Sequence, residues 1–417
     1  MSEVIMLAEK AREAAGRLAI TSSGQRNRAL LAMSHALTHH QESILEANTR
    51  DMDAARAKNV GASLLDRLEL SPARLKSMSE ALRALSLLPD PVGEVVEGYT
   101  MPNGIRLSKI RVPLGVVGMI YEARPNVTAD AAGLCIKTGN AVVLRGGSLS
   151  VNSNITLANV LSNAATAAGM PEGCIQIIES TDREAAEELM GLHGLIDVLI
   201  PRGGAGLIRS VVENAKVPVI ETGVGNCHIY IHSEADADMA RKIVINAKVQ
   251  RPGVCNAAES LLVDEDVYER VLPAILKELE SAGVAIVADE ATRSLGAVMR
   301  IEAATEEDWG TEYLDMKISV KVVKGLDEAI RHINTYGTKH SEAIVTNDYM
   351  AAQRFLNEID AAAVYVNAST RFTDGGEFGL GAEIGISTQK LHARGPMGLT
   401  ALTSTKYIAY GSGQIRE

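Results

Sequence analysis

Aromatic residues and cysteines are scarce in this sequence, and both shortages limit the kinds of protein it can be. Aromatic side chains make up 3% of the 417 residues, so we expect a core built mainly from Ala, Val, Ile and Leu. That mixture is typical of buried parallel strands covered by helices. The four cysteines are widely spaced and form no Cys-x-x-Cys pair: Cys135, Cys174, Cys227 and Cys255. We therefore expect neither a disulfide framework nor a zinc knuckle, and the composition indicates a reducing cytoplasm.

Other absences exclude further classes of protein. No run of about 18 apolar residues is present that could span a bilayer. The first residues lack the basic segment and following apolar segment of a secretion signal. The net charge of -11 argues against general binding to nucleic acid, because the phosphate backbone would be repelled. We predict a cytoplasmic protein with no metal site, no nucleic-acid partner and no membrane attachment.

The length and the order of apolar patterns predict an α/β fold with more than one domain. A chain of 417 residues is too long for one simple core. Residues 1–90 have apolar side chains at helical spacing, whereas strand and helix patterns alternate from residue 113 to about residue 395. Such alternation predicts βαβ units, and we expect two doubly wound αβ domains. Asp264 and Asp266 are expected to cap one of the helices.

A β-hairpin is predicted between the helical region and the first αβ domain. Residues 93–112 form two strand patterns joined by Asn103-Gly104, which is a strong signal for a hairpin turn. One further strand is expected in the tail, residues 396–417. A two-stranded ribbon is only marginally stable alone, so we expect it to pack on a partner subunit in an oligomer that is at least a dimer.

Cys255 is the strongest candidate for a reactive side chain. It follows Arg251-Pro252-Gly253 and precedes small residues, so it is expected on an open turn. A nearby cation such as Arg251 would favour the thiolate, which is the nucleophilic form. The alternative is that Cys255 is simply a small buried side chain, as most free cysteines are.

Two glycine-rich turns are candidates for the functional site, the first for binding an anionic ligand and the second for placing a carboxylate. Gly203 and Gly204 follow a predicted strand and precede a helix, where backbone N–H groups could hold a diphosphate. Their spacing is not that of the standard dinucleotide fingerprint, so a purely structural turn remains an alternative. Glu221 ends another strand before Gly223 and either faces a cleft or is simply solvated.

Several motifs together resemble the aldehyde dehydrogenase superfamily over nearly the whole chain. The motifs are residues 113–120, Arg124-Pro-Asn126, residues 137–145, Glu221-Thr-Gly, Cys255, Glu312 and Phe378-Gly379. Residues 323–344 resemble the branch of this superfamily that reduces an acyl phosphate in proline synthesis. This string, which contains Tyr336-Gly-Thr338 and His340-Ser-Glu342, is too specific to be expected by chance.

The resemblance implies a mechanism centred on Cys255. Its thiolate would attack gamma-glutamyl phosphate, release phosphate and leave a thioester, which NADPH would reduce to glutamate 5-semialdehyde. The amide of Asn126 and the backbone N–H of Cys255 are the expected oxyanion donors, although Asn126 could instead only cap a helix. Glu221 matches the general base of hydrolysing relatives, and its role here stays open between proton handling and local structure.

The resemblance also implies a nicotinamide cofactor. Glu312 matches the carboxylate that holds the nicotinamide ribose in relatives, and Phe378 is placed in the same site. NAD-using relatives often have Lys-Pro-Ser-Glu where this chain has Arg145, Gly146, Gly147 and Ser148. Because the acidic residue is missing and Arg145 would attract a 2′-phosphate, NADPH is favoured. Gly203 and Gly204 complete the predicted cofactor site.

Arg124 and Arg251 are the predicted phosphate ligands of the substrate, with structural ion pairs as the alternative. Residues 369–374 are a candidate for part of the pocket that holds the amino-acid head. Association with glutamate 5-kinase, which would supply the labile acyl phosphate, is a further hypothesis. The competing functions are a hydrolysing NAD(P)-dependent aldehyde dehydrogenase and a scaffold without activity.

We assign residues 1–92 and 113–223 to an NADPH-binding domain and residues 224–395 to a catalytic domain. Residues 93–112 and 396–417 are expected to form the oligomerisation hairpin and tail.

Overall fold

The chain forms two compact units in the structure, a computed structural model that describes residues 2–416 apart from the side chains of Ala62 and Ser63. Unit 1 is made of Met1–Thr222, Gly379–Gly385 and Met397–Glu417, and unit 2 of Gly223–Phe378 and Ile386–Pro396. The sequence suggested a continuous second domain over residues 224–395. Residues 379–385 instead belong to unit 1, in which the N–H of Ile384 donates to the carbonyl of Met397.

The helical region predicted for the first 90 residues is confirmed. Its helices are α1 (Glu3–Leu18), α2 (Ser23–His39), α3 (Gln41–Ala57), α4 (Ala62–Leu68) and α5 (Pro72–Leu87). At three of the helix starts the side chain of a serine accepts a backbone N–H group of the first turn. These serines are Ser2, Ser22 and Ser71. These bonds satisfy backbone donors that the first turn of a helix leaves without a partner, so the local sequence fixes where the helices begin.

Unit 1 contains a parallel four-stranded sheet with the strand order β5-β4-β3-β6. The strands are β3 (Val116–Tyr121), β4 (Ala141–Gly146), β5 (Ile175–Ile177) and β6 (Val198–Arg202). Four helices and one short 3-10 helix connect or follow them: α6 (Asn126–Lys137), η1 (Ser148–Ser150), α7 (Val151–Ala167), α8 (Arg183–Gly191) and α9 (Ala205–Asn214). Every residue of β3 is buried, as expected for a strand covered on both faces.

Helices cover this sheet on both sides. One core joins α1 and α8 to the strands through side chains such as Ala8, Val143 and Leu189. Helices α6 and α7 lie against the other face of the sheet and contact α2. Further helices form an outer layer beyond α2. The carboxyl ends of the strands are therefore left for the loops that carry the candidate site.

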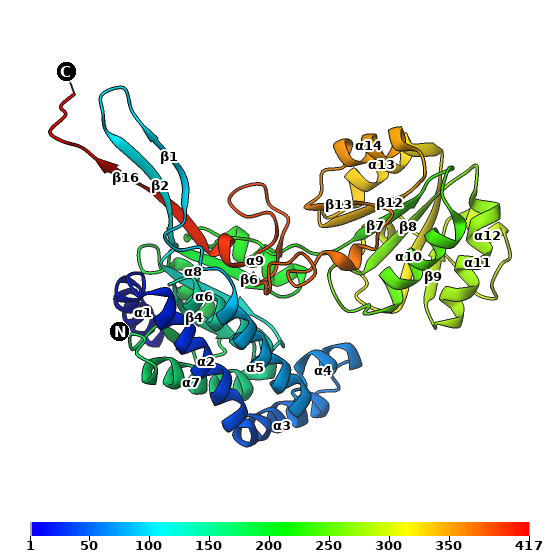
Figure 1. Ribbon diagram of the computed structural model, residues 1–417. Coiled ribbons are helices and arrows are strands. Elements are labelled where there is room, and N and C mark those ends of the chain that lie inside the picture. The colour runs from blue at the N-terminus through cyan, green and yellow to red at the C-terminus, as the bar shows by residue number, and fades with distance from the viewer. Residues whose placement is uncertain (1, 417) are drawn as a thin grey trace. The chain divides into compact units, whose positions relative to one another are not determined.

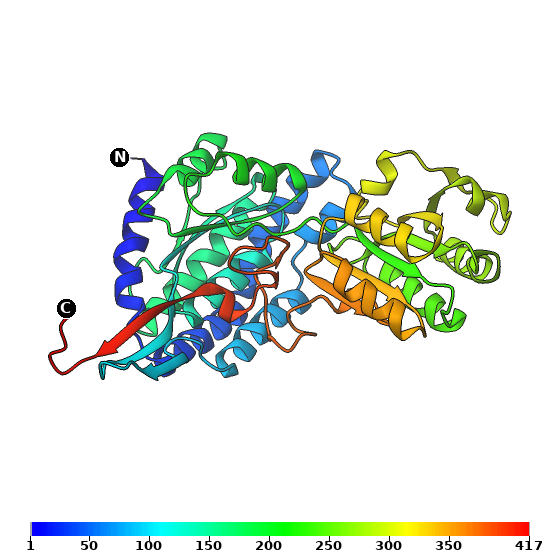
Figure 2. The same cartoon turned by 90° about the horizontal axis from the view of Figure 1, so that it is seen from above.

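The predicted hairpin is present and has a third strand. Strands β1 (Val95–Thr100) and β2 (Arg106–Pro113) pair antiparallel, and β16 (Thr403–Tyr410), which follows η4 (Leu399–Leu402), pairs with β2. Figures 1 and 2 both show the red β16 running along the cyan β2. Gly104 closes the turn with a φ of 85°, a conformation that suits glycine. Every side chain of β1 is exposed.

Unit 2 is built on a larger parallel sheet with the strand order β10-β9-β11-β8-β7-β12-β13. The strands are β7 (Cys227–Ile231), β8 (Ala258–Asp264), β9 (Ala285–Ala288), β10 (Glu302–Ala303), β11 (Lys317–Val323), β12 (Ser341–Val345) and β13 (Ala363–Val366). A separate antiparallel pair is formed by β14 (Ile386–Ser387) and β15 (Gly395–Pro396).

The helices of unit 2 lie on both faces of this sheet (Figure 1). One face packs against α10 (Ala237–Val249) and α11 (Tyr268–Ser281), and the other against α13 (Gly325–Tyr336) and α14 (Tyr349–Glu358). The remaining helices are α12 (Glu290–Ser294), η2 (Glu307–Gly310) and η3 (Thr370–Phe372). The order and the helices on both faces confirm a doubly wound αβ fold.

The predicted cap of α11 is wrong. The helix begins at Tyr268, and its N-cap residue Val267 makes no side-chain capping bond. Asp264 instead accepts the N–H of Asp266 at 3.1 Å and the hydroxyl of Tyr230 at 2.7 Å. Its carboxylate is used by a neighbouring strand, which sequence spacing alone does not reveal. Within residues 2–416, none of the helices is long and apolar enough to cross a membrane.

Candidate active site

The four thiols differ in their exposure. Cys135, Cys174 and Cys227 are buried, and burial raises the pKa of each, to about 12 for Cys174. Cys255 is only half-buried, on the turn that joins α10 to β8. Among the thiols within residues 2–416 it is therefore the one that solvent reaches.

The backbone around Cys255 is packed closely against the residues that precede β7. A Cβ on Gly225 would lie 1.5 Å from the carbonyl oxygen of Cys255, so only glycine fits there. The thiol of Cys227 donates to the same carbonyl over 3.2 Å. Both contacts are made to the backbone carbonyl of Cys255 and help to fix the turn in place.

Glu312 is tied to this backbone. Its Oε1 accepts the N–H of Gly225 at 2.7 Å, and Gly225 in turn touches Cys255. The carboxylate predicted to hold the nicotinamide ribose thus lies in unit 2, and a single residue, Gly225, contacts both this carboxylate and Cys255. The sequence placed these residues far apart, and the fold brings them together.

Two arginines accompany the turn of Cys255. Arg251 is exposed at its start. Arg371 donates to Oε1 of Gln250 at 2.8 Å and to Oδ1 of Asn256, on either side of the thiol. Burial lowers the pKa of Arg371, the charge of Arg251 lowers it further, and Cys255 opposes both. The turn is therefore accompanied by two guanidinium groups, whose positive charge would attract an anionic substrate.

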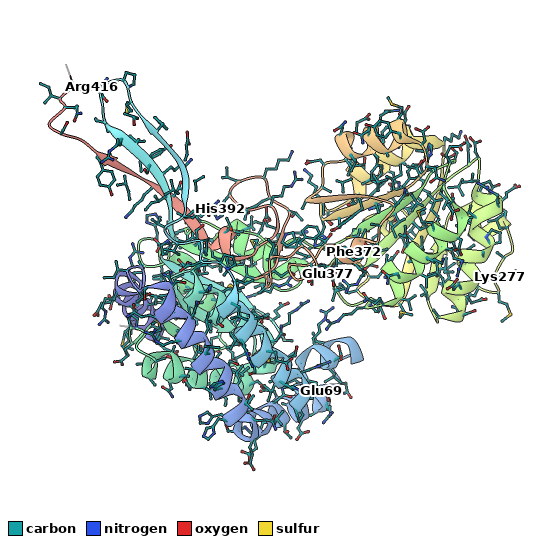
Figure 3. The ribbon with its side chains drawn as sticks, viewed as in Figure 1. Glu69, Lys277, Phe372, Glu377, His392 and Arg416 are labelled. Carbon is teal, nitrogen blue, oxygen red and sulfur yellow. The ribbon has the colours of Figure 1, made fainter. Side chains whose placement is uncertain are left out.

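The segment Ser369–Asp374 packs against the same turn. The hydroxyl of Thr370 donates to the carbonyl of Asn256 at 2.8 Å, and Nδ2 of Asn256 donates to the carbonyl of Thr373 at 2.8 Å. Phe372, which ends η3 and is labelled in Figure 3, is 49% exposed, and Phe378 is 44% exposed. Sequence reasoning singled out this segment but not Arg371 as a partner of the turn.

Unit 1 brings the remaining predicted residues to one edge of its sheet. Tyr121 at the end of β3 is paired with Gly146 on β4 and with Arg202 on β6. The loops that follow these strands therefore begin side by side, and β3 is the strand at which the order reverses. Open αβ sheets bind ligands at this position.

Asn126 lies at the first position of α6 and is exposed. The N-cap residue is Pro125, and no side chain caps this helix, so the alternative that Asn126 serves as a cap is wrong. Its Nδ2 instead donates to Oδ2 of Asp130 at 3.0 Å. Burial raises the pKa of Asp130 to about 6, against the opposing effects of Asn126 and Arg202.

The turn of Gly203 and Gly204 follows β6 and precedes α9, as predicted. The N–H of Gly204 donates to Oε2 of Glu122 at 2.9 Å, and a Cβ on Gly203 would lie 2.6 Å from the same oxygen. Glu122 follows β3 and was not noticed in the sequence. Its carboxylate stands in for an anion at the start of α9, which demonstrates that this backbone can hold one.

Arg145 and the residues after it lie at the end of β4. A terminal nitrogen of Arg145 donates to the carbonyls of Thr181 and Asp182 at 2.7 Å and 3.0 Å, and burial lowers its pKa. A Cβ on Gly146 would lie 2.0 Å from Nδ2 of Asn154, so packing alone requires this glycine. Gly147 passes the backbone of Glu122, and Ser148 begins η1.

Arg124 and Glu221 are half-buried in unit 1. Arg124 precedes Asn126, and Glu221 precedes Thr222, whose hydroxyl donates to the carbonyl of Pro201 on β6 at 2.8 Å. The predicted residues thus form two groups, one in each unit. Residues 2–416 contain no group of three or more His, Cys, Asp or Glu side chains that could hold a metal ion.

Comparison with known proteins identifies the family of the chain. The chain matches the model of the Aldehyde dehydrogenase family over residues 1–308 and 318–408. It is 61% identical to the Gamma-glutamyl phosphate reductase of Moorella thermoacetica over 415 residues, which cover 100% of this chain and 99% of the relative. The corresponding protein of Caldanaerobacter subterraneus is 57% identical and is covered completely, as is this chain.

A solved structure gives the same result. The crystal structure of Gamma-glutamyl phosphate reductase from Thermotoga maritima has a TM-score of 0.95 and 48% sequence identity, with 100% of each chain covered. The enzyme of the same name from Saccharomyces cerevisiae matches with a TM-score of 0.56 and 30% identity over 100% of this chain and 99% of that one. The chain therefore belongs to the aldehyde dehydrogenase family and, within it, to the gamma-glutamyl phosphate reductases.

Proposed function

We propose that this chain reduces L-gamma-glutamyl 5-phosphate to L-glutamate 5-semialdehyde with NADPH and releases inorganic phosphate, as a step of L-proline biosynthesis in the cytoplasm. The observation that carries the proposal is the position of Cys255. It is a half-buried thiol on a turn that also carries Arg251 and is bonded by Arg371, in a chain whose other thiols are buried.

The first step forms a thioester. The thiolate of Cys255 adds to the acyl carbon, and the bond to the phosphate oxygen then breaks, so that phosphate leaves with the bonding electrons. Arg251 and Arg371 supply positive charge for the thiolate and the departing phosphate. Arg124 is the third candidate phosphate ligand. The amide of Asn126 and the N–H of Cys255 are proposed to donate to the oxyanion.

The second step reduces the thioester to the aldehyde. When bound, NADPH supplies the hydride for this reduction. The resulting thiohemiacetal oxyanion collapses, expels the thiolate of Cys255 and gives the aldehyde, again with the oxyanion donors in place. Cys255 is thereby returned to its starting form.

The residues present fit a dinucleotide. At the start of α9 the N–H of Gly204 already donates to a carboxylate oxygen of Glu122, at the sheet edge where anionic ligands bind. Glu312 would hold the nicotinamide ribose, and Phe378 is proposed for the same cofactor site. Arg145, Gly147 and Ser148 would lie at the adenosine end, where the stretch 145–148 contains no carboxylate that would repel a 2′-phosphate. NADPH is proposed over NADH for this reason.

Glu221 is compatible with a second function, the oxidation of a free aldehyde in which NAD(P)⁺ takes the hydride and water hydrolyses the thioester on Cys255. This hydrolysing reaction would need Glu221 as a general base. We favour the acyl phosphate reaction because the relatives with 57–61% identity over the full chain share that name. In the proposed reaction Glu221 contributes to proton handling or to the local fold.

The reverse reaction tests the proposal without the labile acyl phosphate. Purified protein is mixed with glutamate 5-semialdehyde and NADP⁺, and NADPH formation is followed with and without inorganic phosphate or arsenate. We expect turnover only when one of these anions is present. Turnover in water alone would favour the hydrolysing function, and no turnover in either condition would favour a scaffold.

Two further arms complete this test. Replacing NADP⁺ with NAD⁺ measures the proposed cofactor preference. Adding purified glutamate 5-kinase to a forward assay, with a trap for free acyl phosphate, measures the proposed association. If the trap captures the acyl phosphate equally well with and without a complex of the two enzymes, direct transfer of the acyl phosphate between them is contradicted.

A further inference from the structure

A fully buried ion pair joins the two elements that flank the turn of Cys255. Nζ of Lys248 is 2.6 Å from Oε2 of Glu259, and both side chains have 0% exposure. Lys248 is in the last turn of α10, and Glu259 is the second residue of β8. The pair therefore links the two elements that residues 250–257, the turn with Cys255, connect along the chain.

The same carboxylate reaches a second part of the candidate site. Oε1 of Glu259 accepts the N–H of Leu314 at 3.1 Å. Leu314 has a φ of 54°, a left-handed conformation that a non-glycine residue adopts only when its surroundings hold it. Two residues earlier, Glu312 binds the N–H of Gly225, whose backbone touches Cys255. One side chain thus connects the nucleophile's turn with the segment of Glu312.

Stability is a poor explanation for this pair. Removing two charges from water is costly, and well-packed apolar side chains of the same volume are often at least as stable. Burial raises the pKa of Glu259 and lowers the pKa of Lys248, and each partner opposes the shift of the other. The catalytic steps proposed above use neither residue, although both are in the core of the site.

We propose that Lys248 and Glu259 are positioning residues, which fix the turn of Cys255 through their ion pair and the segment of Glu312 through the bond to Leu314. The inference rests on the proposed function, because it concerns the alignment of the same thiol and cofactor carboxylate. Alignment of this kind matters because a displacement of about 1 Å can cost about 100-fold in rate.

Two double variants separate the two links. K248M/E259Q removes the ion pair and keeps an oxygen that can accept the N–H of Leu314, whereas K248M/E259L removes both. We expect kcat to fall about 100-fold in both variants, with little change in the KM for the acyl phosphate. We expect the Kd for NADPH, measured by fluorescence titration, to rise only in K248M/E259L, by about 10-fold.

Two controls distinguish positioning from other roles. Melting temperatures identify a general loss of stability, and R26M/D90L is the control variant, because the buried Arg26 of α2 forms an ion pair with the half-buried Asp90 in unit 1. This variant should keep kcat. The second control is the rate at which iodoacetamide alkylates Cys255, measured against pH without cofactor. The midpoint of this pH profile should be the same in both Lys248 variants as in wild type, because a small reagent does not need an aligned thiol.

The outcomes are distinct. A kcat within about two-fold of wild type in K248M/E259L would overturn the inference. So would an alkylation midpoint displaced by a full pH unit, which would indicate control of the thiol pKa in place of alignment. If the wild-type protein does not turn over the acyl phosphate, the proposed function fails by itself. The ratio of NADPH affinities between the two double variants then still decides whether Glu259 acts through Leu314.

Discussion

At the scale of single residues, exposure separates one thiol from three. Burial raises the pKa of Cys135, Cys174 and Cys227, because an ionised sulfur loses its hydration in the core. We expect iodoacetamide at pH 8 to label Cys255 first and the other three only after unfolding. Mass spectrometry of peptides measures the order. Equal early labelling of Cys227 would contradict it, and Cys255→Ser should lose both the early label and at least about 1000-fold in activity.

Asp130 gives a prediction for the dependence of activity on pH. Its pKa of about 6 means that the carboxylate is ionised above pH 6 and accepts strongly from Asn126, whereas below pH 6 it is protonated and its charge is lost. We therefore expect kcat to fall as the pH drops through 6. Asp130→Asn, which is neutral at every pH, should lose about 10-fold at pH 8 and should lack this fall.

The same variant has an effect on stability of the opposite sign. A carboxyl whose folded pKa is raised stabilises the fold fully below its unfolded pKa of 3.8 and loses this contribution as the pH rises through about 6. Asp130→Asn should therefore melt at a higher temperature than wild type at pH 8, while being less active. Arg202, the charged neighbour that lowers the pKa of Asp130, is unchanged in both proteins. A variant that is both less active and less stable at pH 8 would contradict this account.

At the scale of elements, the turn between α10 and β8 depends on the backbone before β7. A Cβ on Gly225 would meet the carbonyl of Cys255 at 1.5 Å, so Gly225→Ala must displace the turn of Cys255 or its own segment. We expect a loss of several kcal/mol of stability, among the larger effects of single substitutions, or a folded protein without activity. Thermal melts and kcat measure the two results.

Gly16→Ala is the matched control for this substitution. Gly16 is exposed within α1, and a Cβ there would meet nothing within 4 Å. We expect this change to stabilise the protein by about 0.5 kcal/mol, because alanine reduces the freedom of the unfolded chain. A Gly225→Ala variant that behaves like Gly16→Ala would show that the close approach is not required.

At the scale of the whole molecule, the antiparallel sheet of β1, β2 and β16 suggests assembly with a second copy. Val95 and Tyr99 on β1 are 60% and 51% exposed, and Tyr407 on β16 is 60% exposed. Both outer strands also present backbone groups that no other strand of residues 2–416 pairs with. We propose at least a homodimer that uses this sheet, and light scattering after gel filtration should give twice the mass of 44.3 kDa or more.

A substitution tests whether this sheet is the interface. V95E/Y99E places two charges on β1, and we expect it to shift the protein toward a monomer, since burying unpaired charges in an interface is costly. Tyr349→Glu, on α14 of unit 2, is a control at an aromatic residue that is even more exposed, at 72%. If V95E/Y99E remains a dimer and Tyr349→Glu becomes a monomer, the interface is not on the sheet of β1, β2 and β16.

The sequence by itself determined the features that depend on neighbours along the chain. Residues 113–395 alternate between strand and helix because their apolar periods alternate, and Asn103-Gly104 closes a hairpin because few other residues adopt its turn. The turn of Cys255 follows from Pro252 and Gly253. The α11 cap was predicted wrongly because Asp264 accepts a bond from Tyr230, 34 residues away.

Only the tertiary structure decided which distant side chains meet. Glu122 reaches Gly204, 82 residues later, because β3 and β6 are neighbours in the sheet. Arg371 reaches Asn256, 115 residues earlier, because its loop folds back onto the turn of the thiol. Such contacts depend on the order of the strands and on the packing of the loops. Residue spacing carries no direct record of either, so the partners of the reactive groups could be found only in the folded chain.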